Sequence, residues 1–308
     1  MIGAVDIGGT KIAVGMVDEV GRVLSRLECP TEAERGPDNG ISRMVNMLRQ
    51  ALSQAMAGQT DRILQGIGIG CTGPVYPALG TVGEVEFLRG WEGADLVEPL
   101  ESEFGVPVAL ENDADAAALG EWAWGAGRGT RKFILVTVGT GIGAGLVLDG
   151  QLYRGVDGSH PEIGHHVIDP SGPPCSCGAH GCWESLASGP AMERWAQAHH
   201  PRGAWLSAYQ LCTDAESGDS LAQVAVQRTA VYLGLGLANL VTLFTPDMIA
   251  LSGGLLKSRH LFMPKIEETV RTNCGYVPHH LVRVLPATLD AQTGLVGAAR
   301  AWYHHYAA

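Results

Sequence analysis

Apolar and polar residues alternate along two stretches of the chain, and a glycine-rich corner interrupts each of them. The first stretch covers residues 2–18. Its part from 5 to 18, VDIGGTKIAVGMVD, aligns without a gap with residues 136–149, VTVGTGIGAGLVLD. Alternation with a period of two predicts β-strands, and a short corner between two such runs predicts a hairpin. The sequence therefore predicts the same hairpin twice, once near the start of each half.

Helical and strand patterns follow one another in the rest of the chain. The Ala-rich run after Asp113 has high helix propensity, and Asn112 or Asp113 is placed to cap it. Strands that alternate with helices predict an α/β protein, and the duplicated hairpin favours two related halves that face each other over a cleft. The other predicted elements are helices at 40–56, 188–198, 220–244 and 294–306, strands at 66–70, 106–111 and 248–251, and a polar loop at 73–93.

Composition limits the kind of protein and the kind of partner. A chain of 308 residues predicts two domains. Its net charge of -11 disfavours nucleic acid and anionic membranes as partners, since clustered Lys and Arg hold phosphate-rich surfaces, so we expect a small molecule. The apolar run 231–244 contains glycines and stops before Pro246, which predicts a buried helix. No signal peptide is expected, and seven cysteines of this spacing predict a reducing cytoplasm.

Three glycine turns each follow an apolar strand, at residues 6–11, 139–143 and 252–254. Backbone N–H groups can approach a phosphate only where no Cβ intervenes, so glycines at strand ends suit a nucleotide site. Thr10, Thr140 and Lys11 add further donors. One such turn alone is more typical of a tight hairpin. Three in one chain favour phosphate binding, and the lack of GxxxxGK[ST] excludes a P-loop.

A carboxylate lies at a second kind of corner, where Glu111-Asn112-Asp113 ends a strand and begins a helix. Asp113 could accept the proton of a substrate hydroxyl that attacks a γ-phosphate, the role that phosphoryl transfer requires of a protein base. The alternative is that Asp113 only caps the helix. Taken alone, the three residues favour the cap.

The motifs occur in one order: DIGGTK, ENDADAAALGE, VTVGTGIGAG, PEIGHHVID, CSCGAHGCWES and LSGGLL. In this the chain resembles the ROK family of bacterial sugar kinases, in particular glucokinase-like members that contain zinc. The resemblance covers essentially the whole chain. It implies an α/β, two-domain, RNase H-like fold of the actin/hexokinase type with an interdomain cleft. We expect one domain to consist of residues 1–115 and a C-terminal helix at 292–308. The other domain is expected to consist of residues 116–291 and to contain the zinc loop.

The same resemblance implies the reaction. We expect an ATP-dependent hexose kinase that transfers the γ-phosphate to the 6-hydroxyl of glucose, with Asp113 as catalytic base and Asp6 orienting Mg2+ through water. The first two glycine turns would hold phosphates and the third would lie near adenosine. The residues expected to bind the nucleotide are Asp6, Gly8, Gly9, Thr10, Lys11, Gly139, Thr140, Gly141, Gly253 and Gly254.

Histidines and cysteines gather in the Gly/Pro-rich segment 164–185. In ROK kinases with this cluster, one structural zinc is bound through the E-x-G-H and C-x-C-G-x-x-G-C motifs. Three thiolates and one imidazole also form a closed tetrahedral zinc set on chemistry alone. The spacing disfavours the alternatives of a redox motif and of unpaired cysteines. The matching ligands are His165, Cys175, Cys177 and Cys182.

Sugar contacts are implied by the same motifs, and we expect the zinc to hold a loop that has no core of its own. His160 and His166 are interpreted as polar loop residues, and Asp115, at an Asn of the family motif, as a helix-face residue rather than a catalyst. Phe87 replaces an Asn of glucokinase-like members, and His160-Pro-Glu resembles fructokinases. Glucose, mannose, fructose and N-acetylhexosamines therefore stay open, as does polyphosphate as donor. The expected sugar-binding residues are Gly73, Asn112, Asp113, Glu162, His165 and Glu184.

Two other classes of protein are disfavoured. A ROK transcriptional repressor resembles the kinases but carries an added N-terminal helix-turn-helix. Because DIGGT begins at Asp6, we expect no such domain, and the acidic charge agrees. A zinc-ribbon module would need a second ligand pair, and the remaining cysteines, Cys29, Cys71, Cys212 and Cys274, are scattered. The expected partners are a sugar and ATP, with no nucleic acid and no membrane, in a homodimer.

Overall fold

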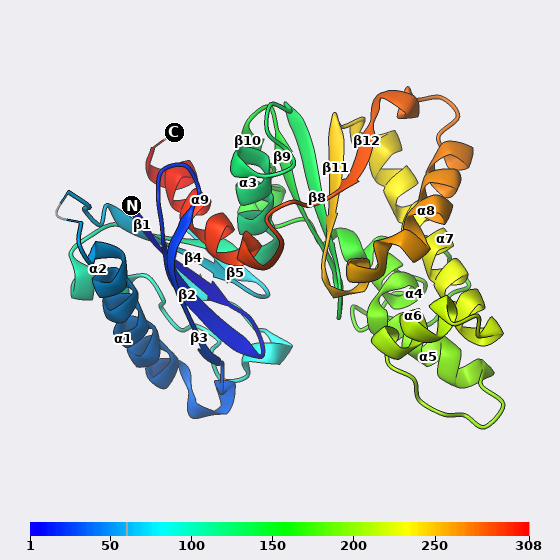
Figure 1. Ribbon diagram of the computed structural model, residues 1–308, viewed down its shortest axis with the longest axis horizontal. Helices are drawn as coiled ribbons and strands as arrows, with labels where there is room; N and C mark the ends of the chain where they lie inside the picture. The colour runs from blue at the N-terminus through cyan, green and yellow to red at the C-terminus, as the bar shows by residue number, and fades with distance from the viewer. Residues whose placement is uncertain (60, 308) are drawn as a thin grey trace. The chain divides into compact units, whose positions relative to one another are not determined.

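The computed structural model describes residues 1–59 and 61–307, which form two compact units (Figure 1). Unit 1 consists of Met1–Gly129, Gly145–His160 and Ala287–Ala308, and unit 2 of Thr130–Ala144 and Pro161–Pro286. These limits differ from the expected boundary at residue 115. The reason is local: α3 (Asp113–Trp124) continues past that boundary and packs along α9 (Thr293–Tyr306).

Unit 1 is built on a five-stranded sheet in the order β3-β2-β1-β4-β7. The β1–β2 hairpin is antiparallel, with Ile7 opposite Ile12, whereas β4 runs parallel to both β1 and β7. The strands of the unit are β1 (Ile2–Ile7), β2 (Lys11–Val17), β3 (Val23–Pro30), β4 (Gly66–Cys71), β5 (Val75–Tyr76), β6 (Thr81–Val82), β7 (Val108–Asn112) and β10 (Gln151–Leu152). Its helices are α1 (Pro37–Met56), α2 (Glu98–Phe104), α3 and α9.

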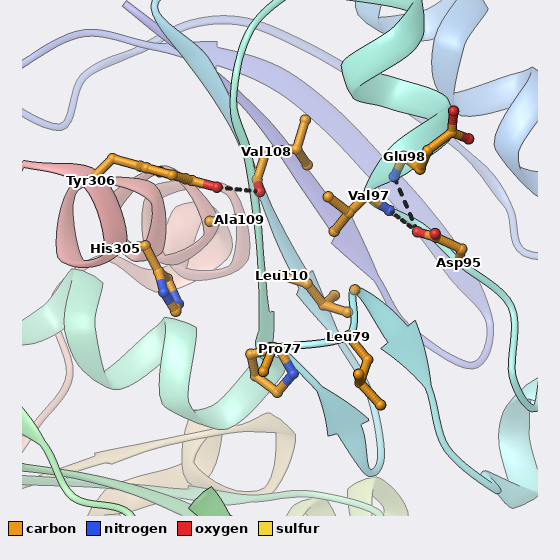
Figure 2. Close-up of a pocket in the computed structure, with 12 residues that line it drawn as sticks. Pro77, Leu79, Asp95, Val97, Glu98, Val108, Ala109, Leu110, His305 and Tyr306 are labelled. Carbon is orange, nitrogen blue, oxygen red and sulfur yellow. Dashed lines mark hydrogen bonds between the residues drawn. The ribbon is translucent and has the colours of Figure 1, made fainter.

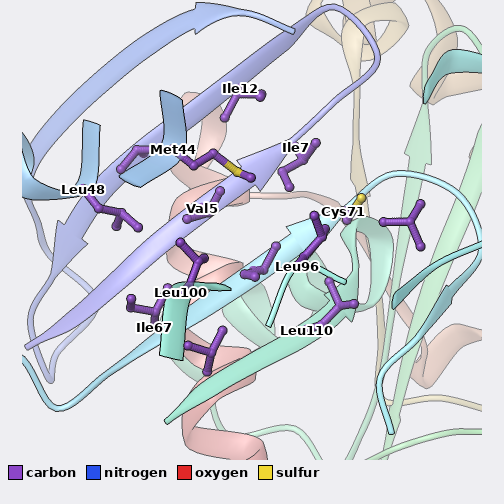
Figure 3. Close-up of a cluster of buried hydrophobic side chains, with 14 of the residues drawn as sticks. Val5, Ile7, Ile12, Met44, Leu48, Ile67, Cys71, Leu96, Leu100 and Leu110 are labelled. Atoms are coloured by element: carbon purple, nitrogen blue, oxygen red, sulfur yellow. The ribbon is translucent and has the colours of Figure 1, made fainter. Parts of the chain in front are cut away.

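The two faces of this sheet bury different side chains. Val5 and Ile7 belong to the cluster that packs on α1 and α2 (Figure 3), whereas Ile2 and Ala4 belong to the cluster on α9. β4 follows the same period of two, because its isoleucines face the first cluster and its glycines face α9. A Cβ on Gly68 would overlap the backbone of Ala298. The glycines of GIGIG therefore let α9 approach the sheet closely.

Unit 2 carries a second sheet, and the whole sheet has the strand order β10-β9-β8-β11-β12. β9 begins in unit 2 and continues into unit 1 from Gly145. β11 runs parallel to β8 and β12. The strands are β8 (Lys132–Val138), β9 (Ile142–Leu148), β11 (Met248–Ser252) and β12 (Arg283–Pro286), and the helices are α4 (Trp183–Ala187), α5 (Gly189–His199), α6 (Ala208–Glu216), α7 (Ser220–Phe244) and α8 (Arg259–Asn273).

α7 is the long apolar helix expected from the sequence. Its length and composition would be sufficient to cross a membrane, but 61% of its most apolar window is buried inside the protein, as in the core helix of a globular domain. It packs against α8, α6, α4 and α5. Both predicted hairpins are present as β1–β2 and β8–β9, and the α/β class is confirmed.

A buried glutamate holds together two segments of unit 1 that are next to unit 2 in the sequence, one before residue 130 and one after residue 286. Glu121, on α3, is completely buried and accepts hydrogen bonds from the backbone N–H groups of Ala126 at 2.9 Å, Thr288 at 3.0 Å and Leu289 at 2.8 Å. A buried N–H group without an acceptor destabilises the folded state, so Glu121 stabilises the fold by accepting from all three. Glu121 therefore ties α3 to residues 287–289, where the last segment of unit 1 begins.

Candidate functional site

The first glycine turn lies between β1 and β2. It is closed by a hydrogen bond from Gly8 N to Lys11 O at 2.9 Å, and Thr31 Oγ1 donates to Gly8 O at 2.6 Å. A Cβ on Gly9 would meet Phe87, so the turn has to be free of a side chain there. The ammonium of Lys11 is exposed and pairs with Glu28 Oε1 at 3.0 Å. Lys11 would have to exchange this partner to bind a phosphate.

The Asn112–Asp113 corner joins β7 to α3. Asn112 is the N-cap, because its Oδ1 accepts hydrogen bonds from Ala114 N at 2.9 Å and Asp115 N at 3.3 Å. Of the two caps that the sequence offered, Asn112 or Asp113, the structure therefore has Asn112. Its Nδ2 donates to Gly73 O at 3.0 Å. Gly73 has φ +81° and a Cβ there would strike Val85, so only glycine fits. The corner and the Gly73 turn are therefore held together, with Asp113 left for another role.

The carboxyl group of Asp113 has an unusually high pKa. Although part of the residue is accessible, protein surrounds its carboxylate, and this burial raises the pKa of Asp113 to about 7, helped by the negative charge of Asp6. The hydrogen bond from Ala114 N, at 2.8 Å, acts in the opposite direction. A carboxylate that titrates near neutral pH can both accept and release a proton, which is what a general base requires.

Asp6, at the end of β1, lies against the first turn of α9. A Cβ on Gly294 would overlap the Asp6 carboxylate, so the glycine at the second position of the helix makes room for it. Burial also raises the pKa of Asp6. The partial positive charge at a helix N-terminus favours an anion there. Asp6, Asp113, the Gly73 turn and the first glycine turn thus form one group of predicted site residues in unit 1.

In unit 2, the other two glycine turns lie next to each other. Gly139 N donates to Gly141 O at 2.9 Å, and a Cβ on Gly139 would lie 3.8 Å from Gly254 N. Gly253 has φ +104° and packs directly on Val138, a position that no L side chain fits. The two turns, with Thr140 between the glycines of the first, therefore form one backbone-lined surface.

Glu184 connects this surface to the cysteine loop. It lies on α4, two residues after Cys182, and its Oε2 accepts from Ile142 N at 2.9 Å beside Gly141. This hydrogen bond uses only one of the two carboxylate oxygens. Glu162 is exposed and precedes the short 3-10 turn Ile163–His165. The structure therefore places both predicted sugar-binding carboxylates of unit 2 on the segments that flank the cysteines.

The four predicted zinc ligands converge. One ligand atom from each of His165, Cys175, Cys177 and Cys182 lies within 4.8 Å of the others. His165 Nδ1 is 3.3 Å from Cys175 Sγ, and the sulfurs of Cys177 and Cys182 are 3.5 Å apart, so no disulfide joins them. Tetrahedral Zn–S bonds of about 2.3 Å put sulfurs about 3.8 Å apart. The donor set fits a closed zinc site, with Nδ1 as the histidine ligand.

Two residues that the sequence did not connect are in contact. Asp115, expected on a helix face, is on α3 and completely buried. His160 lies on a loop, as expected, and its Nδ1 lies 2.6 Å from Asp115 Oδ2. His166 is partly buried, with its ring edge-on to Trp183 at 5.4 Å. The sequence signal for this pair was a carboxylate, Asp115, in an Ala-rich helix, a composition typical of a buried helix. Its partner could not be identified from the sequence, because His160 lies 45 residues away.

The chain is similar to known proteins over nearly its whole length. The model of the ROK family matches residues 2–305. A glucokinase from Streptomyces coelicolor is 36% identical over 311 residues, 96% of this chain and 95% of that protein. A ROK hexokinase from Thermus thermophilus has a TM-score of 0.86 at 34% identity, and the alignment covers 97% of both chains.

A ROK family glucokinase from Streptomyces griseus, whose structure is in complex with glucose and AMPPNP, is also similar. It has a TM-score of 0.78 at 34% identity, and the alignment covers 97% of both chains. The fold is therefore that of the ROK hexokinases and glucokinases, as the resemblance implied. By its sequence and by its fold, the chain belongs to the ROK family.

Proposed function

We propose that the protein is an ATP-dependent hexose kinase that phosphorylates glucose at the 6-hydroxyl. The observation that carries the proposal is the buried Asp113 carboxylate, whose pKa of about 7 suits a base at neutral pH. The similar glucokinases from two Streptomyces species support the reaction and the sugar. ATP as donor is supported by the AMPPNP bound to one of them.

In the proposed reaction, Asp113 takes the proton of the 6-hydroxyl as that oxygen attacks the γ-phosphorus. A bond forms between the sugar oxygen and phosphorus, the bond from phosphorus to the β–γ bridging oxygen breaks, and ADP leaves with the electron pair. Asn112 and the Gly73 turn orient the hydroxyl. Asn112 is suited to this because its own hydrogen bonds to Gly73 and α3 fix its side chain.

Backbone N–H groups of the glycine turns bind the nucleotide in this proposal, with the donors of Thr10, Lys11 and Thr140 added. Gly253 and Gly254 border the adenosine. Mg2+, held near Asp6 through water, would neutralise charge on the transferred phosphoryl group. The buried Asp6 carboxylate, which lies against the first turn of α9, fits that role.

We propose further that His165, Cys175, Cys177 and Cys182 hold a structural zinc. The metal would fix the segments that carry Glu162, His165 and Glu184, which we propose bind sugar hydroxyls. A homodimer in the cytoplasm is proposed on the family resemblance alone.

A panel of sugars tests the function. Purified protein is incubated with MgATP and glucose, mannose, fructose, N-acetylglucosamine or N-acetylmannosamine, and ADP release is followed by a coupled assay. We expect the largest kcat/KM with glucose and a product phosphorylated at the 6-position by NMR. A higher kcat/KM with another sugar would correct the substrate, whereas no phosphorylation of any sugar would contradict the kinase.

A further inference from the structure

A buried network of charged side chains surrounds the Asn112–Asp113 corner in unit 1. Its centre is Asp115, on the first turn of α3, which is completely buried. Asp115 Oδ2 accepts hydrogen bonds from Arg154 Nη1 and from His160 Nδ1, the latter at 2.6 Å. A buried carboxylate is costly unless it is paired and hydrogen-bonded, so the two partners explain why Asp115 is tolerated there.

Arg154 connects Asp115 to the other side of the corner. Its Nη2 donates to Glu111 Oε1, which also accepts from Asn112 N at 2.9 Å. Glu111 and Asp115 lie on either side of Asn112 and Asp113 in the sequence, one at the end of β7 and one on α3. The forked guanidinium therefore holds the strand end and the helix start in one geometry.

The outer end of the network is accessible. His305 Nε2, on α9, lies 3.5 Å from Glu111 Oε2. His305 and Tyr306 also line a hollow of about 240 Å³ on unit 1, where the hydroxyl of Tyr306 donates to Val108 O (Figure 2). The inner end, at Asp115 and His160, is the one next to the proposed base.

The hydrogen bond to Asp115 fixes the hydrogen positions of His160. An ionised carboxylate only accepts, so Nδ1 of His160 carries the hydrogen and Nε2 is the nitrogen that gains or loses a proton. Glu111 and Asp115 bring two negative charges, and Arg154 brings one positive charge. A protonated His160 makes the network neutral. The charge of this imidazole is therefore matched to the carboxylates around it.

We propose that His160, seated on the Asp115 carboxylate, is a positioning residue that keeps Asp113 ionised and ready to accept the proton of the substrate. The proposal rests on the proposed function of Asp113 as base. His160 does not touch the reacting atoms in it. Its imidazolium acts through space, and Asp115 and Arg154 hold it in place.

The electrostatics of Asp113 agree with this arrangement. Burial, Asp6 and Asp115 raise its pKa, whereas the hydrogen bond from Ala114 N and the charge of His160 lower it. Among these influences, His160 is the cation. The other titratable and charged groups on α3, α9, β1, β4 and β7, together with Arg154 beside them, are Asp6, Cys71, Glu111, Glu121, Arg300, Tyr303, His304, His305 and Tyr306.

Two substitutions separate the charge of His160 from its hydrogen bond. In His160→Asn, the amide Nδ2 can still donate to Asp115, but the titrating nitrogen is gone. His260→Asn is the matched control, because His260 is exposed and pairs with Glu216 at 2.8 Å on the surface of unit 2. The kcat/KM for glucose is measured from pH 5 to 9 at saturating MgATP, and melting curves verify that the variants fold.

We expect the acid limb of the His160→Asn profile to move up by about 1 pH unit, so that kcat/KM at pH 6 falls roughly tenfold and is nearly unchanged at pH 9. The His260→Asn profile should match the wild type. A loss in His160→Asn that is equal at every pH would show a merely structural role and overturn the proposal. So would a profile identical to that of the wild type.

An NMR titration tests the network without any catalysis. The imidazole signal of His160 is assigned by its loss in His160→Asn and followed with pH in the wild type and in Asp113→Asn. Because Asp113→Asn removes a nearby negative charge, His160 should lose its proton at a lower pH in that variant. Equal midpoints would overturn the proposal. Coupled midpoints in a protein that phosphorylates no sugar would instead contradict only the proposed function.

Discussion

The pH dependence of the wild-type enzyme follows from the environment of Asp113. A general base must be ionised, and burial with the charge of Asp6 raises the pKa of this carboxyl to about 7. Well below that pH, each unit of acidification leaves about one tenth as much ionised base. We therefore expect kcat/KM for glucose to reach a plateau above about pH 8, to fall to roughly one tenth of it at pH 6, and to roughly one hundredth at pH 5.

The assay is initial ADP release at subsaturating glucose and saturating MgATP, so that the profile reports the free base rather than nucleotide binding. Asp113→Asn is the control, because its residual rate should show no such limb. Measurements after return to neutral pH exclude irreversible unfolding in acid. A profile flat from pH 5 to 8 would refute the assignment of a buried, neutral-titrating base.

Three further predictions concern stability and metal. The pKa of Asp113 is higher in the folded than in the unfolded protein, so ionisation of Asp113 destabilises the fold as pH rises from about 4 to 7. Asp113→Asn should therefore be more stable than the wild type at pH 8, by up to roughly 4 kcal/mol in urea unfolding, and as stable as the wild type at pH 4. Glu121→Ala leaves three backbone N–H groups unpaired and should lower the free energy of unfolding by about 3–6 kcal/mol, measured in the same way, and Glu121→Gln should lower it by less. If Glu121→Ala is as stable as the wild type, water replaces the carboxylate as the partner of these groups. Cys177→Ala should lose bound zinc by elemental analysis and raise KM for glucose, whereas an unchanged KM in metal-free protein would remove the link between metal and sugar.

Local patterns were sufficient to predict much of the fold. The two hairpins came from period-two alternation, the helix 220–244 from its apolar run, and the cap from Asn112. α8 was not predicted, because Pro264 lies within it and proline is usually excluded from helix interiors. The cysteine cluster was predicted from the family motifs that it matches, and its four proposed ligands lie within 18 residues of sequence.

The buried charges could not be predicted in the same way. The pairing of His160 with Asp115 and of Glu121 with residues 288 and 289 joins segments that are far apart in the chain. A single sequence shows an Asp or Glu in an Ala-rich helix but not what faces it, and such residues are usually exposed. Their burial becomes visible only once α3 is packed against α9 and the loop that follows β10.

Turnover by Asp113→Asn tests the central claim most directly. The substitution keeps the size of the side chain and removes the group that accepts the proton. If Asp113 is the base for transfer of a phosphoryl group to the sugar, kcat should fall by about 10²–10⁴-fold while glucose still binds, as measured by calorimetry. Turnover within a few-fold of the wild type would contradict the account.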